Sequence, residues 1–180
     1  HGIHFNDAEL KRLAETGTGV AHCPISNMKL SSGIARIPEM LKLGVRVGLA
    51  VDGSASNDGS DLLEELRTGF LLHRLNSSSA APTGYDMLKI ATRGSASILG
   101  RDDIGQIAEG MAADYFLINM DRLSLTGAQF DVSSMLGTVG YKGNVDYTIV
   151  NGRVVVREGR LTGVDEEKIT AEANHCVSRY

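Results

Sequence analysis

The feature that most constrains the fold is an apolar run that stops at an acidic residue. The run covers residues 45–51 (VRVGLAV), and Asp52 leads from it into the small polar loop 53–57 (GSASN). Such runs are typical of a parallel strand that is buried on both faces. An acid at the carboxyl end of a buried strand is where α/β barrels place their chemistry. Two interpretations of Asp52 stay open here: a catalytic carboxylate, or a residue that only begins a turn or caps the next helix.

The residues before this run predict a right-handed βαβ unit. Residues 18–22 (TGVAH) are expected to form a short strand, followed by a loop. A helix is expected to have Pro38 in its first turn and to end at Gly44. Strand, loop, helix and strand within about 35 residues have the size of one βαβ unit. Neither GxGxxG nor GxxxxGK[ST] occurs in it, so no phosphate fingerprint accompanies the unit.

Other helices are expected to follow from their capping signals and their periodicity. They cover residues 7–15, 61–75, 85–99 and 166–177. Asn6 and Glu9 form a capping-box signal before the first of them. In the second, Leu62, Leu66 and Phe70 recur at helical spacing, which indicates core packing rather than a binding face.

The pattern changes near residues 105–112, where short strands replace the βα units. Strands are expected at residues 115–118, 146–150 and 153–157. Asn151 and Gly152, between the last two, are the signal of a type I′ hairpin turn, and Asp165 is expected to cap the last helix. We therefore predict a division into residues 1–108, a β-rich part at 109–164 and a C-terminal helix at 165–180.

Composition and charge exclude several classes of function. The net charge of −4 offers no basic surface for nucleic acid. No apolar run approaches the roughly 20 residues that span a membrane, and no signal peptide is recognised. Cys23 and Cys176 lie far apart, and we interpret them as thiols in a reducing compartment. We therefore expect a cytoplasmic protein that binds neither nucleic acid nor membranes.

Several polar side chains lie at the predicted strand ends or in the loops that follow them. They are His1, His22, Asn27, Asp52 and Ser56. In a βα barrel, all of them would face the same mouth. Histidine suits proton transfer and metal ligation, and a carboxylate can hold a metal and accept a proton from a metal-bound water. A lone histidine such as His22 is more often a hydrogen-bonded core residue, and His73 and His175 are expected on the surface.

Several segments, in this order and spacing, resemble the amidohydrolase superfamily. They are HGIHFNDAEL (1–10), TGTGVAHCPISNMKLSSGIA (16–35), VGLAVDGSASNDG (47–59), IGQIAEGMAADYFLINMDRL (104–123) and VDYTIVNGRVVVREGRL (145–161). The resemblance is to the branch that deaminates purines, pyrimidines and triazines. Within that branch, SNMKLSSGIA, VDGSASNDGS and LGRDDIG are most similar to 8-oxoguanine deaminases.

The resemblance implies an α/β fold of which this chain is one portion. Residues 1–108 would supply strands six to eight of a (β/α)8 TIM-like barrel, and residues 109–164 the closing strands of a small β-sandwich. The family's metal also needs an HxH pair from the first strand and a histidine from the fifth, with a glutamate near it as proton shuttle. None of these is in this sequence, which opens at His1 without Met. We therefore expect a cut through a larger domain, which needs the upstream half of the barrel.

The resemblance also implies roles for individual residues. Asp52 corresponds to the aspartate that ends strand eight, binds the catalytic metal and takes a proton from the attacking water. That metal is usually zinc, with iron as an alternative. His1 matches the histidine that ends strand six, hydrogen-bonds the substrate and helps to stabilise the adding hydroxide. Ser56 lies where some relatives contact the substrate. His22 and Asn27 belong to the family's HCPxSN element, which implies substrate-side or scaffold roles.

The function implied for the intact enzyme is hydrolytic deamination of an amino-substituted heterocycle, 8-oxoguanine to urate and ammonia. Deamination or dechlorination of another ring stays an alternative, with an s-triazine, guanine or S-adenosylhomocysteine as substrate. An alternative of another class is a truncated, catalytically inert fragment. We further expect a homo-oligomer whose partner in catalysis is a small heterocyclic molecule.

Overall fold

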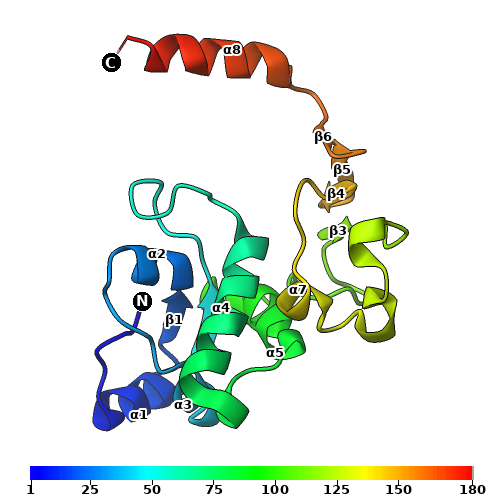
Figure 1. Ribbon diagram of the computed structural model, residues 1–180. Helices are drawn as coiled ribbons and strands as arrows, with labels where there is room; N and C mark the ends of the chain where they lie inside the picture. Colours follow the sequence, from blue (N-terminus) through cyan, green and yellow to red (C-terminus); the bar gives the residue numbers. More distant parts are fainter. Residues whose placement is uncertain (180) are drawn as a thin grey trace.

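The parallel sheet lies at the centre of the N-terminal half. The computed structural model describes residues 1–179, and Figure 1 shows its arrangement. Strands β1 (Gly19–His22) and β2 (Arg46–Leu49) pair in parallel, with Val20 beside Val47. Helices α2 (Pro24–Lys29) and α3 (Ile37–Lys42) connect them. The predicted order of strand, loop, helix and strand is confirmed, and α2 is a short helix where only a loop was expected.

One local feature and one long-range hydrogen bond account for the N-terminal end of α2. Pro24 occupies its first turn, where the missing N–H costs nothing. The Ile25 N–H, which has no partner within the helix, donates to the carboxylate of Glu65. That partner lies 40 residues further along the chain, so the sequence around Pro24 gives no sign of it.

Residues 1–5 contain a turn at residues 3–4 and no strand, so within residues 1–179 the parallel sheet has two strands where three were expected. Gly2 has φ 65°, a left-handed conformation that does not fit an extended strand. Helix α1 (Asp7–Thr16) follows, and its capping box is confirmed. The Asn6 side chain accepts the Glu9 N–H, and the Glu9 carboxylate accepts the Asn6 N–H.

The long helix α4 (Leu62–Ser77) buries a face that overlaps the predicted one in part, with Leu66 in the core and Phe70 packed against it. Of the expected stripe, Leu66 is buried, but Leu62 is 38% exposed and Phe70 is only partly covered. The buried residues are Glu65, Leu66, Gly69, Leu72 and His73. They follow helical spacing, but two of them are polar. An apolar stripe could not reveal this face, because its polar members are buried only through partners on other elements.

The helix expected at residues 85–99 is continuous but not uniform. It runs as α5 (Gly84–Lys89), a π-helical turn (Ile90–Gly94) and α6 (Ser95–Ile98). A Cβ on Gly94 would lie 2.0 Å from the Val47 carbonyl oxygen, so this segment packs directly on the backbone of β2. The contact depends on tertiary packing, which is why the helical period alone did not predict the π turn.

The C-terminal half contains an antiparallel sheet in the order β3, β4, β5, β6. Its strands are β3 (Tyr115–Leu117), β4 (Tyr147–Val150), β5 (Arg153–Arg157) and β6 (Arg160–Leu161). Asn151 and Gly152 have φ of 48° and 76°, so the type I′ turn is confirmed. The short strand β6 and the helix α7 (Met135–Thr138) were not predicted.

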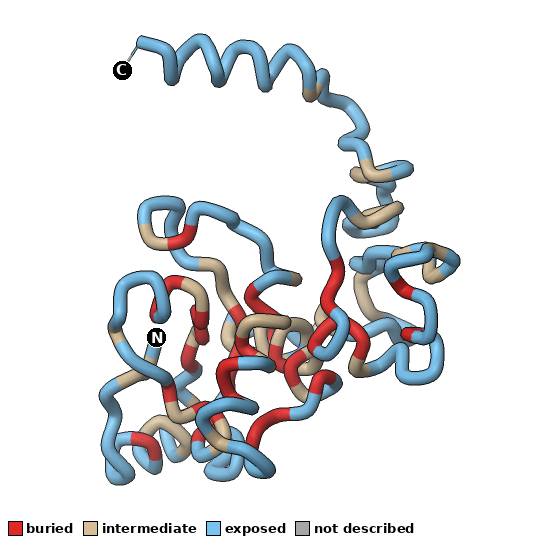
Figure 2. The backbone as a smooth tube through the Cα atoms, in the orientation of Figure 1, coloured by how far each residue is buried: buried red, intermediate tan, exposed pale blue. Residues whose placement is uncertain are grey.

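Helix α8 (Glu166–Val177) is capped by Asp165, which accepts the Lys168 N–H at 2.9 Å, as predicted. No residue of α8 is buried, and the helix lies apart from the rest of the chain (Figures 1 and 2). None of the helices described over residues 1–179 is long and apolar enough to cross a membrane.

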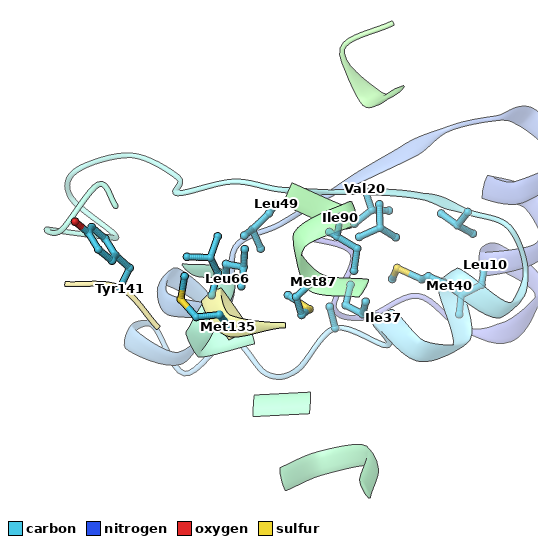
Figure 3. Packing of buried hydrophobic residues seen from close by; sticks show 14 of the residues in the cluster. Leu10, Val20, Ile37, Met40, Leu49, Leu66, Met87, Ile90, Met135 and Tyr141 are labelled. Carbon is cyan, nitrogen blue, oxygen red and sulfur yellow. The ribbon is translucent and has the colours of Figure 1, made fainter. Parts of the chain in front are cut away.

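One hydrophobic core joins the parallel sheet to the helices around it. Its labelled members in Figure 3 include Leu10, Val20, Met40, Leu66 and Met87. The same cluster continues to Met135 and Tyr141, beyond the boundary expected near residue 108. The division of the chain at residues 108 and 164 therefore stays a prediction.

Candidate active site

Asp52 lies just beyond the end of β2, with φ 66°. Its Oδ2 accepts a hydrogen bond of 2.6 Å from the Ser26 hydroxyl, and its Oδ1 accepts the Gly53 N–H at 2.8 Å. These two bonds, the Ser26 bond first, hold the pKa of Asp52 below its usual range. The carboxylate is therefore ionised at neutral pH. Its side chain is 29% exposed, so it remains open to a ligand.

His1 lies beside this carboxylate, and Asn27 fixes its ring. The Nδ1 atom is 2.7 Å from the Asn27 side-chain oxygen, and Nε2 is 3.5 Å from Asp52 Oδ2. Because the amide oxygen can only accept, Nδ1 carries a proton. In the neutral ring Nε2 is then the free nitrogen, and the side chain is 45% exposed. The structure thus brings together His1, Asn27 and Asp52, three of the residues expected from the sequence.

Ser56 lies in the same loop as Asp52, but its hydroxyl has a local partner. Its Oγ donates to the Gly53 carbonyl at 3.1 Å, and the Asn57 N–H donates to the same oxygen at 2.9 Å. These bonds close the turn that follows Asp52. A direct role of Ser56 toward a substrate stays a prediction.

His22 lies apart from this group, in a buried pair with His73. Their Nε2 atoms are 3.0 Å apart, and both side chains are fully buried. Burial, reinforced by the neighbouring ring, lowers the pKa of His22 to about 3, and burial lowers the pKa of His73 to about 4. Both rings are therefore neutral near pH 7, one donating and the other accepting. These contacts match the interpretation of His22 as a hydrogen-bonded core residue.

The expectation that His73 lies on the surface is wrong. Its ring points from the buried face of α4 toward the end of β1, where His22 is its hydrogen-bond partner. The bond satisfies one nitrogen of each ring, but the buried Nδ1 atoms of His22 and His73 have no hydrogen-bond partner among residues 1–179. His175 is exposed on α8, as expected.

Ser26, Asn57 and Glu65 were not singled out from the sequence. Ser26 is buried and bonded to Asp52, while Glu65 is fully buried on α4. Burial raises the pKa of Glu65 to about 7, against the opposing effect of the Ile25 N–H. The only available signal was position: Ser26 lies inside the HCPxSN element, and Glu65 lies one residue before the buried Leu66.

The described residues alone do not form a complete metal site. Among residues 1–179, no group of three or more histidine, cysteine, aspartate or glutamate side chains could hold a metal ion. Asp52 and His1 offer an ionised oxygen and a free ring nitrogen side by side, which suits one edge of a site. Catalytic zinc takes three protein ligands, so a zinc bound at Asp52 would need donors outside these residues.

Two parallel strands, whose following segments carry Ser26, Asn27 and Asp52 beside the His1 ring, define an α/β protein with polar side chains gathered at its strand ends. The chain belongs to the amidohydrolase family, whose model matches residues 1–155. The predicted family is therefore confirmed.

Curated relatives cover nearly the whole chain. Hydroxydechloroatrazine ethylaminohydrolase of Pseudomonas sp. (strain ADP) is 44% identical over 99% of this chain and 38% of its own length. 5-Methylthioadenosine/S-adenosylhomocysteine deaminase of Pelotomaculum thermopropionicum is 41% identical over 99% of this chain and 41% of its own length. 8-Oxoguanine deaminase of Pseudomonas aeruginosa is 44% identical over 99% of this chain and 39% of its own length. The chain thus spans about two fifths of the length of these relatives.

A solved structure shows the same arrangement. The atrazine chlorohydrolase of Arthrobacter aurescens TC1, in complex with zinc, superposes with a TM-score of 0.92 at 34% identity. The match covers 97% of this chain and 39% of that one. The triazine and 8-oxoguanine enzymes are equally similar to this chain, so the relatives agree on hydrolysis of heterocycles but not on one substrate.

Proposed function

We propose that the intact protein is a zinc-dependent hydrolase that removes an amino group from a nitrogen heterocycle. The observation that carries this proposal is the Asp52 carboxylate, which Ser26 and Gly53 hold ionised beside His1 at the end of a parallel strand. Membership of the amidohydrolase family and the zinc in a homologous structure support it. The alternative of an inert fragment predicts no hydrolysis by the intact protein.

In the proposed arrangement β1 and β2 are strands seven and eight of a (β/α)8 barrel, and Asp52 is one metal ligand among several. The other donors would come from outside this chain's described residues. When bound, zinc makes hydroxide available near neutral pH by lowering the pKa of a bound water toward about 7.

In this proposal, each residue of the candidate site has a separate role. Asp52 accepts a proton from the attacking water at a carboxylate oxygen and later gives it to the departing amine. The ring carbon gains the oxygen of that water and loses its amino nitrogen. Each Asp52 oxygen accepts one protein hydrogen bond, which leaves lone pairs for this exchange. His1 uses Nε2 to bind the ring, because Asn27 occupies Nδ1. Ser26 holds the carboxylate in place.

The substrate proposed is 8-oxoguanine, with urate and ammonia as products. The segments SNMKLSSGIA, VDGSASNDGS and LGRDDIG support this choice, together with the 44% identity to an 8-oxoguanine deaminase. A second candidate is an amino-substituted triazine, because the triazine ethylaminohydrolase is equally similar. A site that pairs the polar groups of a purine can discriminate by about 10⁴-fold against analogues that lack them.

The test is a screen of the intact, zinc-loaded protein for amine release. Its substrates are 8-oxoguanine, guanine, S-adenosylhomocysteine and an ethylamino-substituted hydroxytriazine. We expect kcat/KM for 8-oxoguanine to exceed the others by orders of magnitude. Faster release from the triazine would overturn the substrate but keep the reaction class. If none of the four compounds releases an amine, both the proposed substrate and the proposed reaction class are contradicted.

A further inference from the structure

Glu65 joins the two loops that carry the candidate site. It lies in the first turn of α4, and each of its oxygens accepts one hydrogen bond. Oε2 accepts the backbone N–H of Ile25 at 3.1 Å, and Oε1 accepts the Nδ2 group of Asn57 at 2.5 Å. The first donor belongs to α2, after β1, and the second to the loop after β2. Glu65 is fully buried, so neither bond competes with water.

Together with neighbouring hydrogen bonds and peptide links, these contacts form a closed ring that contains both Glu65 and Asp52. Asn57 Nδ2 also donates to the Val51 carbonyl at 2.8 Å, and Val51 directly precedes Asp52. On the other side Ile25 directly precedes Ser26, whose hydroxyl donates to Asp52 at 2.6 Å. The path from Glu65 therefore reaches Asp52 twice, once through the backbone at Val51 and once through the carboxylate.

Asp52 needs such support because its backbone is strained. A non-glycine residue at φ 66° is in the left-handed region, which costs of order 1 kcal/mol or more and persists only where its surroundings fix it. The loop that follows offers few buried contacts of its own, since residues 53–55 and 58–60 are exposed. Asn57 is the buried residue of that loop, and its side chain is bonded to Glu65.

We propose that Glu65 is a positioning residue, which acts through Ile25 and Asn57 to fix the Asp52 carboxylate in its working position. The inference rests on the proposed function in that Asp52 is taken to act in hydrolysis. The pattern of bonds requires a carboxylate, because both partners are N–H donors. Glutamine would direct its own N–H₂ group at one of them. A residue needed only to fill space would not have to accept twice.

The first test is structural and independent of activity. Crystal structures of the intact protein would be compared for wild type, Glu65→Gln and the neighbouring control Glu64→Gln, whose side chain is exposed on the same turn. In Glu65→Gln we expect the Asn57–Val51 or the Ser26–Asp52 bond to be lost and Asp52 to move, while Glu64→Gln matches wild type. An unchanged Asp52 in Glu65→Gln would overturn the proposal.

The second test is kinetic and uses the same variants. Misplacing a reacting group by about 1 Å can cost about 10²-fold in rate, so we expect Glu65→Gln to lower kcat by about that factor with KM nearly unchanged. Rates are expressed per bound zinc and per folded molecule. A variant that melts earlier but keeps its kcat would show a merely structural role and contradict the proposal.

Asn57→Ala breaks the same ring at its second point with a smaller change. Like Glu65→Gln, it is expected to lower kcat. If Glu65→Gln does not fold, Asn57→Ala replaces it in both tests. If wild type releases no amine from any heterocycle, the proposed function fails. The structural comparison then still decides whether Glu65 positions Asp52.

Discussion

At the scale of single residues, the surroundings of two nearby carboxylates shift their pKa values in opposite directions. Hydrogen bonds from Ser26 and Gly53 lower the pKa of the half-open Asp52, whereas burial raises that of Glu65 to about 7. Asp52 is partly exposed and open to a ligand, whereas Glu65 is fully buried and contacts only protein donors. Opposite shifts in neighbouring groups are a common sign of divided roles in a site.

The buried pair of His22 and His73 makes a prediction for stability. Both folded-state pKa values lie below the ordinary value of 6.5, so below pH 6.5 the unfolded chain binds protons that the folded chain does not. Stability should fall as the pH drops from about 6.5 toward 4, by about 1.4 kcal/mol per pH unit for each histidine. Glu65 acts with the opposite sign between pH 4.5 and 7, because its folded pKa is raised.

The measurement is urea denaturation of the intact protein from pH 8 to pH 4, for wild type and His73→Phe. Glu65 is present in both, so its effect cancels in the difference. Below pH 6.5, the free energy of unfolding of His73→Phe should fall less steeply with falling pH than that of wild type, by about the contribution of one histidine. The control His175→Phe, on exposed α8, should show the same pH dependence as wild type. Parallel curves for wild type and His73→Phe would show that His73 does not remain neutral in the folded state.

At the scale of elements, local signals predicted local structure. The capping box at Asn6, the hairpin turn at Asn151 and the cap at Asp165 are each set by neighbouring residues, and all three formed as expected. The buried face of α4 could not be predicted in this way. Glu65 and His73 lie on that face because their partners come from α2, β1 and the loop after β2. Period and hydropathy do not encode those partners.

The π-helical turn (Ile90–Gly94) depends on one close contact with β2. A Cβ on Gly94 would lie 2.0 Å from the Val47 carbonyl oxygen, so Gly94→Ala must displace β2 or the turn. We expect it to destabilise the intact protein by at least about 1–3 kcal/mol, the usual cost of overpacking. Gly53→Ala is the control, because a Cβ there meets nothing within 4 Å. Equal denaturation midpoints for the two variants would contradict the packing described here.

At the scale of the whole molecule, the chain spans about two fifths of its relatives and supplies part of a site. The sequence indicated His1, Asn27 and Asp52 as residues at or after predicted strand ends, and the structure brings these three together although no strand precedes His1 among the described residues. His22 stands at a strand end too, but its side chain faces α4. Strand position alone does not tell which face a side chain takes. The predicted homo-oligomer stays a prediction.

A further prediction concerns the isolated segment of residues 1–180. Its described residues, 1–179, contain no group of three ligands as a catalytic zinc site needs, and the two-stranded parallel sheet has open edges. We expect this segment to bind no stoichiometric zinc, to release no ammonia and to self-associate. Zinc analysis, the ammonia assay and sedimentation would check the three points. A monomeric, zinc-loaded and active segment would mean that Asp52 does not belong to a larger site.

The most direct test of the central claim is the rate of ammonia release by the intact, zinc-loaded protein before and after Asp52→Asn. Asparagine tolerates the left-handed backbone of this position, so the variant should stay folded. We predict that wild type deaminates 8-oxoguanine and that Asp52→Asn lowers kcat at least about 100-fold, because a group that moves protons contributes that much or more. A folded, zinc-loaded Asp52→Asn protein with near-normal turnover would contradict the role given to Asp52.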